Sequence, residues 1–422
     1  MMVNTLLSKL AASQQGSEIV KLGNAISERI RNGEKIYNYT IGDFDPSIFP
    51  IPKAFEDAIR EAYKNHHTNY PPADGILELR QSVSHFLKEW EGLDYAPNEI
   101  QIAAGGRPLI YTIFKVIVDK GDKVIYAAPS WNNNHYTNMN EAEHCLIEAT
   151  LENNFMPTAN DIAKNIKGAT LICLCTPQNP TGTTLQKDVL EEICDLIIAE
   201  NASRGDAEKK CYLMFDQMYW TLTYGTTQHY NPVSLRPKMK DYTVFVDGIS
   251  KVLAATGVRV GWAFGPAEII AKVKAILSQI GAWAPMAEQK ALAKYLLQTD
   301  NIQQYLIHFK AEMENRLVSI YNGFIALKVK GFLVDAVVPQ AAIYLTVQIN
   351  LRGKKTATNS QLITQADVTE YILSEAKLAI VPFTAFGATA ESNWYRLSVG
   401  TCKKEDLPDM FTKLEMALSK LM

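Results

Sequence analysis

Short apolar runs alternate with amphipathic stretches through the middle of the chain. The runs are rich in β-branched and aromatic residues without a helical period, which predicts strands, whereas apolar residues recur at helical spacing in the stretches between them. Such alternation is typical of an α/β fold with a mostly parallel sheet covered by helices. The predicted strands are residues 100–104, 123–127, 145–149, 170–175, 211–215, 243–246 and 260–265, and the intervening helices include 108–118 and 188–200.

The pattern changes after residue 265, where long amphipathic stretches replace the short alternation. Residues 267–280 and 302–327 are predicted to be helices, and we expect the second to be broken or bent because it exceeds the usual helix length. Strand-like runs and a last amphipathic stretch follow, a mixture typical of an α+β unit. The predicted strands are residues 342–350 and 377–382, and the closing helix is 407–422.

A chain of 422 residues exceeds what one hydrophobic core usually holds, so we expect two domains. The large domain, with the mostly parallel sheet between helices, is predicted to span residues 51–325. The smaller α+β domain spans 326–422, and residues 1–50 form an N-terminal arm and part of the small domain. The polar segment 352–360 is poor in apolar residues and is predicted to be an exposed loop.

Composition narrows the class of partner. With 47% hydrophobic and 21% charged residues and a formal net charge of −3, the chain gives no electrostatic reason to expect nucleic acid. It has no run of about 18 apolar residues, and its start lacks an apolar core followed by a cleavage site, so we expect no membrane and a cytoplasmic location. The six cysteines lack a paired metal spacing, which favours reduced thiols and no metal.

Polar residues follow two of the predicted strands. Asn179 lies in the stiff turn of residues 176–183, where its amide could meet a ligand oxygen or simply belong to a well-made loop. Asp216 could cap the next element or hold a protonated ring nitrogen, with Tyr219 close enough to reach the same ligand. Because open α/β sheets bind ligands at the carboxyl ends of their strands, these residues form a candidate site.

Lys251 and Arg259 lie beyond another strand, and Gly257 and Gly261 flank the arginine. A lysine can form an imine with an aldehyde once its pKa is lowered by burial or by neighbouring positive charge. An arginine fork suits a phosphate, and the flanking glycines let the backbone come close. An amine for an aldehyde and a fork for a phosphate together indicate one cofactor, pyridoxal 5′-phosphate.

These motifs resemble the class I and II aminotransferases, which are fold-type I pyridoxal-phosphate enzymes related to aspartate aminotransferase. The landmarks run in family order from Ile36 to Thr401, and Ser250-Lys251 followed by Gly-x-Arg-x-Gly around Arg259 is highly specific in that company. The resemblance implies a fold-type I transferase and an enzyme that uses pyridoxal phosphate. It also implies that Lys251 is the Schiff-base lysine, that Asp216 pairs with the pyridine nitrogen, and that Asn179 and Tyr219 bond the 3′ oxygen.

The resemblance assigns further binding residues, each of which read alone would be an ordinary turn, core or surface residue. It implies that Tyr70 reaches the cofactor phosphate of a neighbouring subunit, and hence that the protein is a homodimer with shared active sites. The other implied contacts are Gly105, Gly106 and Arg107 with the phosphate at a helix N-terminus, Trp131 with the cofactor ring, and Arg396 and Gly42 with the substrate α-carboxylate.

Two departures from the family pattern concern the same site. Gly248 stands where many relatives have a serine whose hydroxyl binds the phosphate, so Arg259, Ser250, Tyr70 and the glycine loop are expected to bind more of that anion. The segment Ile41-Gly-Asp-Phe-Asp-Pro46 permutes the family's Gly-x-Pro-Asp-Phe pattern.

Substrate choice is a separate hypothesis. The implied reaction moves an amino group from an L-amino acid to a 2-oxo acid by a ping-pong mechanism. Arg107 could face a distal carboxylate, which favours aspartate or glutamate, or it could point at phosphate or solvent. Aromatic or alanine transamination and carbon–sulfur lysis use the same lysine and remain alternatives. A cofactor-sensing regulator is a further alternative, but it would need a DNA-binding domain, for which the residues before Ile36 lack room and basic charge.

Overall fold

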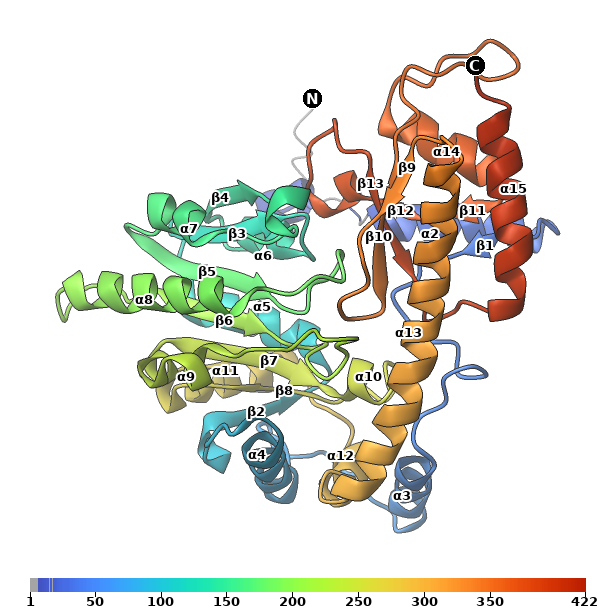
Figure 1. Cartoon of the computed structure of the whole chain (residues 1–422). Coiled ribbons are helices and arrows are strands. Elements are labelled where there is room, and N and C mark those ends of the chain that lie inside the picture. The colour runs from blue at the N-terminus through green and yellow to red at the C-terminus, as the bar shows by residue number, and fades with distance from the viewer. Residues whose placement is uncertain (1–6, 15, 17) are drawn as a thin grey trace.

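The computed structural model describes residues 7–14, 16 and 18–422, so positions 1–6, 15 and 17 of the predicted N-terminal arm lie outside the described residues. Within the described part, the largest sheet has seven strands in the order β2-β8-β7-β6-β5-β3-β4 (Figure 1). β8 runs antiparallel to both of its neighbours, β2 and β7, and the other adjacent strands of this sheet are parallel. The strands are β2 (Ile100–Ala103), β3 (Lys123–Ala128), β4 (Glu143–Glu148), β5 (Ala169–Cys175), β6 (Tyr212–Asp216), β7 (Thr243–Gly248) and β8 (Gly261–Phe264).

All the strands predicted for this sheet are confirmed, with small shifts at their ends. The clearest shift is in β4, which begins at Glu143 rather than at residue 145 because Glu143 and His144 continue the pairing with β3. β4 is the edge strand and most of its side chains are exposed. Its first residues are therefore polar, and an apolar pattern could not reveal them.

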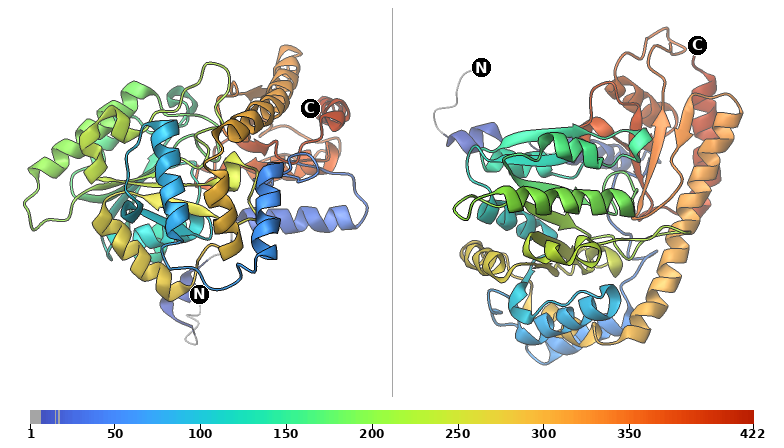
Figure 2. Two further views of the ribbon diagram at one scale, coloured as in Figure 1. Left: turned by 90° about the horizontal axis from the view of Figure 1, so that it is seen from below. Right: turned by 60° about the vertical axis from the view of Figure 1, so that its left-hand side comes forward.

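Alternate residues of the central strands face two different helix layers, as the two-residue period of a strand requires. In β7, Val244 and Val246 pack with apolar residues of α5 and α11, whereas Phe245 belongs to the core under α8. Figures 1 and 2 show these helices on opposite faces of the sheet. The first layer contains α5 (Gly106–Ile117), α6 (Asn133–Met139) and α11 (Ala267–Ile280), and the second contains α7 (Ala159–Asn165), α8 (Lys187–Ser203) and α9 (Pro232–Leu235).

Three further helices pack together near the β2 edge of the sheet (Figure 1). The stacked rings of Phe55 and Tyr295, with centroids 5.4 Å apart, join two of them. The helices are α3 (Lys53–Lys64), α4 (Leu77–Glu91) and α12 (Met286–Tyr295).

The long helix α13 (Thr299–Val329) is a single helix of 31 residues, so the break that its length suggested is absent. Its buried residues recur every three or four positions from Ile302 to Leu327, and it contains no proline. One continuous apolar stripe thus packs on the parts of the chain at both ends of the helix, which stabilises its full length. None of the described helices is both long and apolar enough to cross a membrane.

A smaller antiparallel sheet lies beside the upper half of α13, in the order β12-β13-β10-β9 (Figure 1). The strand predicted at 377–382 is divided between two sheets, because residues 378–379 pair in parallel with residues 37–38 while 381–382 pair with β13. The remaining elements are α1 (Lys9–Ser13), α2 (Glu18–Arg31), β1 (Tyr37–Asn38), β9 (Val334–Ala336), β10 (Tyr344–Ile349), α14 (Gln365–Glu375), β11 (Leu378–Ala379), β12 (Val381–Pro382), β13 (Trp394–Ser398) and α15 (Leu407–Ser419).

Two other predictions concern single segments and side chains. Residues 352–360 form a largely exposed loop, as predicted. The six cysteines all carry free thiols, and only Cys145 and Cys175 are partly exposed.

Candidate active site

Lys251 lies in the one-turn helix α10 (Ile249–Val252), directly after β7. Its Nζ donates a hydrogen bond to the Gly42 carbonyl oxygen at 2.6 Å. The same nitrogen lies 5.5 Å from the ring centroid of Phe44 and 5.8 Å from that of Tyr219. The lysine is thus held between the N-terminal segment and the loop after β6, among aromatic rings that exclude water.

This environment makes the Lys251 amine easier to deprotonate. Burial lowers the pKa of Lys251 to about 8; Asp43 opposes this shift, and the guanidinium groups of Arg396, Arg107 and Arg259 reinforce it. A substantial fraction of the amine is therefore neutral near physiological pH, the form that a nucleophile or a general base needs.

Arg396 in β13 is 2% exposed and marks the other side of this site. Its Nη1 donates to Asn179 Oδ1 at 3.1 Å, and its Nη2 donates to the Thr40 carbonyl oxygen at 2.6 Å. Arg396 Nε has no hydrogen-bond partner among the described residues. Rings of Tyr344 and Phe386 lie 4.7 and 4.9 Å from the guanidinium carbon. A buried cation whose hydrogen-bond acceptors are all neutral is suited to bind an anion.

Gly42 joins the two groups. A Cβ at this position would lie 2.7 Å from the Tyr344 hydroxyl and 3.6 Å from Arg396 Nη1. Only a glycine therefore lets the backbone approach both side chains while its carbonyl oxygen accepts from Lys251. The family resemblance predicted that Gly42 lies beside Arg396, and the structure brings Gly42, Lys251 and Arg396 together.

Tyr219 lies beside the lysine in the turn after β6, and Asp216 is the last residue of that strand. Asp216 Oδ1 accepts from the Met218 amide at 3.0 Å, and burial raises the pKa of this carboxyl to about 6. The Tyr219 and Tyr344 hydroxyls share a hydrogen bond of 2.7 Å, and burial raises the pKa of Tyr219 well above its usual value. Asp216 is thus an anion that gains from a cationic partner, while the tyrosine pair stays neutral.

The glycine loop and Arg259 form a second subsite at the start of α5. Gly105 has φ +86°, and a Cβ there would lie 2.5 Å from Arg259 Nη2. That nitrogen donates to the Ala104 carbonyl oxygen at 2.7 Å, and Nη1 donates to the Thr256 carbonyl oxygen at 2.8 Å. Gly106 opens the twelve-residue helix α5, and Ser250 is buried next to Lys251. A guanidinium beside a helix N-terminus is a suitable place for a phosphate.

The glycine that departs from the family motif has a structural reason here. A Cβ at Gly248 would lie 2.7 Å from the Cα atom of Gly261 and 3.0 Å from the Val260 carbonyl oxygen. β7 and β8 approach too closely at this point for any side chain, because Gly248 pairs with Gly261. A serine at this position would clash with the neighbouring strand.

Arg107 and Trp131 contact each other at the outer edge of the site. The Arg107 guanidinium carbon lies 5.1 Å from the Trp131 ring centroid, and Arg107 is exposed. Trp131 also lies near the ring of Phe386, with ring centroids 6.2 Å apart, and Phe386 in turn lies against Arg396. Arg107 is therefore linked to Arg396 through the rings of Trp131 and Phe386.

Among the described residues, Tyr70 makes no hydrogen bond or ring contact with another predicted site residue. It is 84% exposed, and its ring meets only that of Trp283 edge-on, with centroids 5.5 Å apart, among the described aromatic residues. This exposure of the Tyr70 side chain fits the sequence expectation that it acts on a neighbouring subunit.

Sequence reasoning missed two residues that shape the site. Tyr344 is buried and holds Tyr219, and Asp43 accepts a hydrogen bond of 2.5 Å from the Thr256 hydroxyl in the segment between Lys251 and Arg259. Tyr344 lies two residues before Thr346, which pairs with Arg396 across β10 and β13. That shared face could have revealed Tyr344, but only once the strand pairing was known.

The fold and these subsites define a class of protein, the fold-type I transferases that bind pyridoxal phosphate. The sequence model of the family described as aminotransferase class I and II matches residues 35–414, and the chain belongs to this family. It is therefore an aminotransferase, and the predicted family, fold class and enzyme class are confirmed.

Named relatives agree with this assignment. An aspartate aminotransferase from Geobacillus stearothermophilus is 28% identical over 386 residues, which cover 90% of this chain and 92% of the relative. The crystal structure of the aspartate aminotransferase from Rhizobium meliloti has a TM-score of 0.89 at 25% identity and covers 99% of both chains. The aspartate aminotransferase from Thermus thermophilus with maleate has a TM-score of 0.85 at 26% identity, with 98% and 99% coverage.

Proposed function

We propose that this aminotransferase uses pyridoxal 5′-phosphate and transfers the amino group of an acidic L-amino acid, aspartate or glutamate, to a 2-oxo acid in a ping-pong reaction. One observation carries the proposal. A lysine with a lowered pKa and a buried arginine without an anionic partner are held by neighbouring carbonyl groups, those of Gly42 and Thr40. A lysine amine beside a guanidinium that can receive a carboxylate suits the two ends of an α-amino acid.

The described residues fit the proposed cofactor. The phosphate would lie on the N-terminus of α5, with Arg259 and Ser250 as donors and Gly105 as the close backbone approach. Asp216 would accept from the ring nitrogen, since its buried carboxyl gains from a cationic partner. Asn179 and Tyr219 are placed to meet the ring oxygen. When bound, the cofactor supplies an aldehyde for the amino group and a protonated ring that takes up an electron pair.

The chain's own residues bind the substrate and move its proton. Arg396 binds the α-carboxylate, using the guanidinium nitrogens that now meet only Asn179 and Thr40. Gly42 lets the backbone lie against the same carboxylate. Lys251 would remove the proton from the substrate α-carbon as a general base.

Substrate preference rests on Arg107 and on the named relatives. Arg107 is the exposed cation at the outer edge of the site, and its position over Trp131 leaves the guanidinium edge free for a distal carboxylate. Several relatives, among them those from Geobacillus stearothermophilus and Rhizobium meliloti, carry the name aspartate aminotransferase. Both support an acidic substrate.

A homodimer is part of the proposal. Tyr70 is 84% exposed, which suits a residue that completes the phosphate subsite of a second copy. The proposed boundary between the large and small domains, at residues 325 and 326, lies inside α13, so this helix would connect them. We also place the protein in the cytoplasm, where six free thiols stay reduced.

A donor panel tests the function. The holoenzyme is mixed with L-aspartate, L-glutamate, L-alanine, L-tyrosine or L-cystathionine in the absence of a 2-oxo acid, and the absorbance of the two cofactor forms is followed. We expect aspartate and glutamate to convert the aldehyde form into the amine form fastest. Conversion by tyrosine or alanine alone would indicate the other transaminases, and ammonia release without lasting conversion would indicate a lyase.

A further inference from the structure

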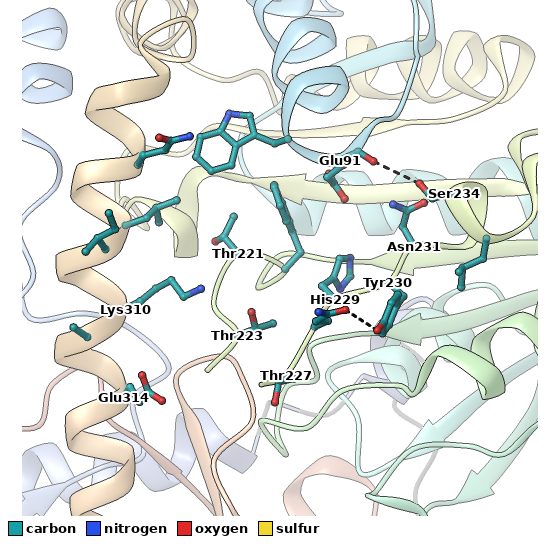
Figure 3. Close-up of a pocket in the computed structure, with 18 residues that line it drawn as sticks. Glu91, Thr221, Thr223, Thr227, His229, Tyr230, Asn231, Ser234, Lys310 and Glu314 are labelled. Carbon is teal, nitrogen blue, oxygen red and sulfur yellow. Dashed lines mark hydrogen bonds between the residues drawn. The ribbon is translucent and has the colours of Figure 1, made fainter. Parts of the chain in front are cut away.

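A cavity of about 880 Å³ lies between α13, the end of α4 and the segment of residues 220–235 (Figure 3). None of the residues assigned to the candidate active site lines it. Side chains from α13 and from the opposite loop extend into the same space, as Figure 3 shows for Lys310, Thr221 and His229.

The cavity belongs to the other side of the sheet from α5. Val246 packs with the α5 layer, so the next residue of β7, Asp247, faces the opposite side. There Asp247 Oδ2 accepts from Nε1 of Trp220, which lines the cavity, at 3.0 Å. The cavity and the phosphate-binding loop therefore lie on two faces of one sheet and are two separate sites.

Several polar atoms in the cavity wall are buried without a partner. Within the described residues, no hydrogen bond reaches either ring nitrogen of His229, the Thr221 hydroxyl or Trp90 Nε1. Thr221 is only 8% exposed. Buried polar groups are nearly always paired in folded proteins, so a group of unpaired ones around a single cavity indicates that a ligand supplies the partners.

The charges of the wall favour an anion. The Lys310 ammonium has neither a hydrogen bond nor an ion pair within the described part of the chain, and burial lowers its pKa, with Glu314 opposing. Both carboxyl groups of the wall already accept hydrogen bonds, Glu91 from Gln217 Nε2 at 2.8 Å and Glu314 from the Gly225 amide at 3.1 Å, and burial raises the pKa of Glu91 well above its usual value. Burial also lowers the pKa of His229 to about 3, so its ring is neutral and can both donate and accept.

The rest of the wall suits a flat apolar body. The indole rings of Trp90 and Trp220 meet edge-on with centroids 6.5 Å apart, and the Trp220 centroid lies 6.3 Å from that of His229. Leu306 and Ile307 of α13 line the facing side. Aromatic rings and leucine are the usual surfaces for an aromatic ligand.

We propose that this cavity is a second binding site, for a small aromatic monocarboxylate that carries a hydroxyl group. The carboxylate meets Lys310, the ring lies against Trp90 and Trp220, and the hydroxyl bonds His229. The site is separate from the one that carries the proposed function and does not depend on it.

Isothermal titration calorimetry of the full-length protein with 3-(4-hydroxyphenyl)propanoate tests the proposal. Two probes serve as controls on the unaltered protein: 3-phenylpropanoate lacks the hydroxyl, and 4-hydroxyphenethyl alcohol lacks the carboxylate. We expect each control to bind more weakly, and the alcohol at least about tenfold more weakly because it loses the charged contact.

Three variants separate this site from the active site. Lys310→Met should weaken binding of the acid at least about tenfold, while Lys272→Met, an exposed lysine of α11, should leave it unchanged. Arg396→Lys should also leave it unchanged, because Arg396 does not line the cavity. Loss of binding in Arg396→Lys with retention in Lys310→Met would place the probe in the active site and overturn the proposal. Absence of binding to the unaltered protein would overturn it as well.

Discussion

The two ends of the candidate active site differ in how much one chain completes them. At the carboxylate end, Arg396 is 2% exposed and is held by Asn179 and Thr40. At the phosphate end, Arg259 is exposed and Tyr70 is 84% exposed. The proposed carboxylate subsite is thus buried within one chain, whereas the proposed phosphate subsite is open.

This difference in burial indicates where the binding of the substrate carboxylate and the binding of the cofactor phosphate are each determined. A buried guanidinium binds an anion strongly because water does not compete for it, whereas an exposed one gains little until something covers it. The carboxylate end should therefore act within a single chain, and the phosphate end should gain its full affinity only when a second chain brings Tyr70.

The largest effect should come from the closed end. Arg396→Lys removes the fork that can bind a carboxylate with two parallel hydrogen bonds, so kcat/KM should fall about 100-fold or more, mainly through KM for both substrates. Steady-state kinetics measure this, with Arg31→Lys, an exposed arginine of α2, as the matched control. An unchanged KM would show that the carboxylate binds elsewhere.

The open end should respond less strongly. Arg259→Met should weaken cofactor binding about tenfold, because one charged contact at an exposed site is lost while the helix N-terminus remains. Tyr70→Phe should have a smaller effect in the same direction. Equilibrium dialysis against pyridoxal phosphate measures both. If Arg259→Met binds the cofactor as tightly as the unaltered protein, the phosphate lies outside this subsite.

Mixed dimers sharpen the comparison between the ends. Tyr70→Ala and Lys251→Ala chains are unfolded and refolded together. If Tyr70 acts on the partner's site, each mixed dimer has one site with both residues intact, and activity should recover well above that of either variant alone. No recovery in dimers shown to be mixed would mean that Tyr70 acts within its own chain.

Arg107 should affect substrate choice only several-fold, because its guanidinium is exposed and screened. Arg107→Ala is expected to lower the ratio of kcat/KM for aspartate to that for alanine, since the distal carboxylate loses its partner. Competition kinetics with both donors measure the ratio directly. A ratio that does not change would assign Arg107 to the phosphate or to solvent.

A further effect concerns the stability of the fold and involves Asp247, a buried residue of β7. Burial raises the pKa of Asp247 to about 8, so ionising it destabilises the fold progressively from about pH 4 to about pH 8. Asp247→Asn cannot ionise, and its free energy of unfolding relative to the unaltered apoprotein should rise by about 2–3 kcal/mol between pH 5 and pH 7. Urea unfolding at both pH values measures this; a constant difference would show that Asp247 ionises normally.

Much of the site could be predicted because it lies where strands end. Lys251, Asp216 and Asn179 each follow an apolar strand of one parallel sheet, so their order along the chain already implied proximity. The sheet itself was predictable for the same reason, since its buried strands are continuous apolar runs.

The features that could not be predicted from the sequence depend on contacts between distant segments. Tyr344 meets Tyr219 only after the small sheet has formed, and the unbroken α13 depends on packing along its whole length rather than on local propensity. The cavity beside α13 is built from three segments far apart in sequence, and its unpaired groups, such as His229, look ordinary in the sequence.

The exchange of the α-hydrogen of L-aspartate tests the central claim, that Lys251 moves this proton. The holoenzyme is incubated with L-aspartate in D₂O without a 2-oxo acid, and the α-proton signal is followed by ¹H NMR next to the Lys251→Ala variant loaded with pyridoxal phosphate. We predict that the signal disappears with the unaltered enzyme and persists with the variant. Exchange at the same rate in both would contradict the assignment of Lys251 as the general base.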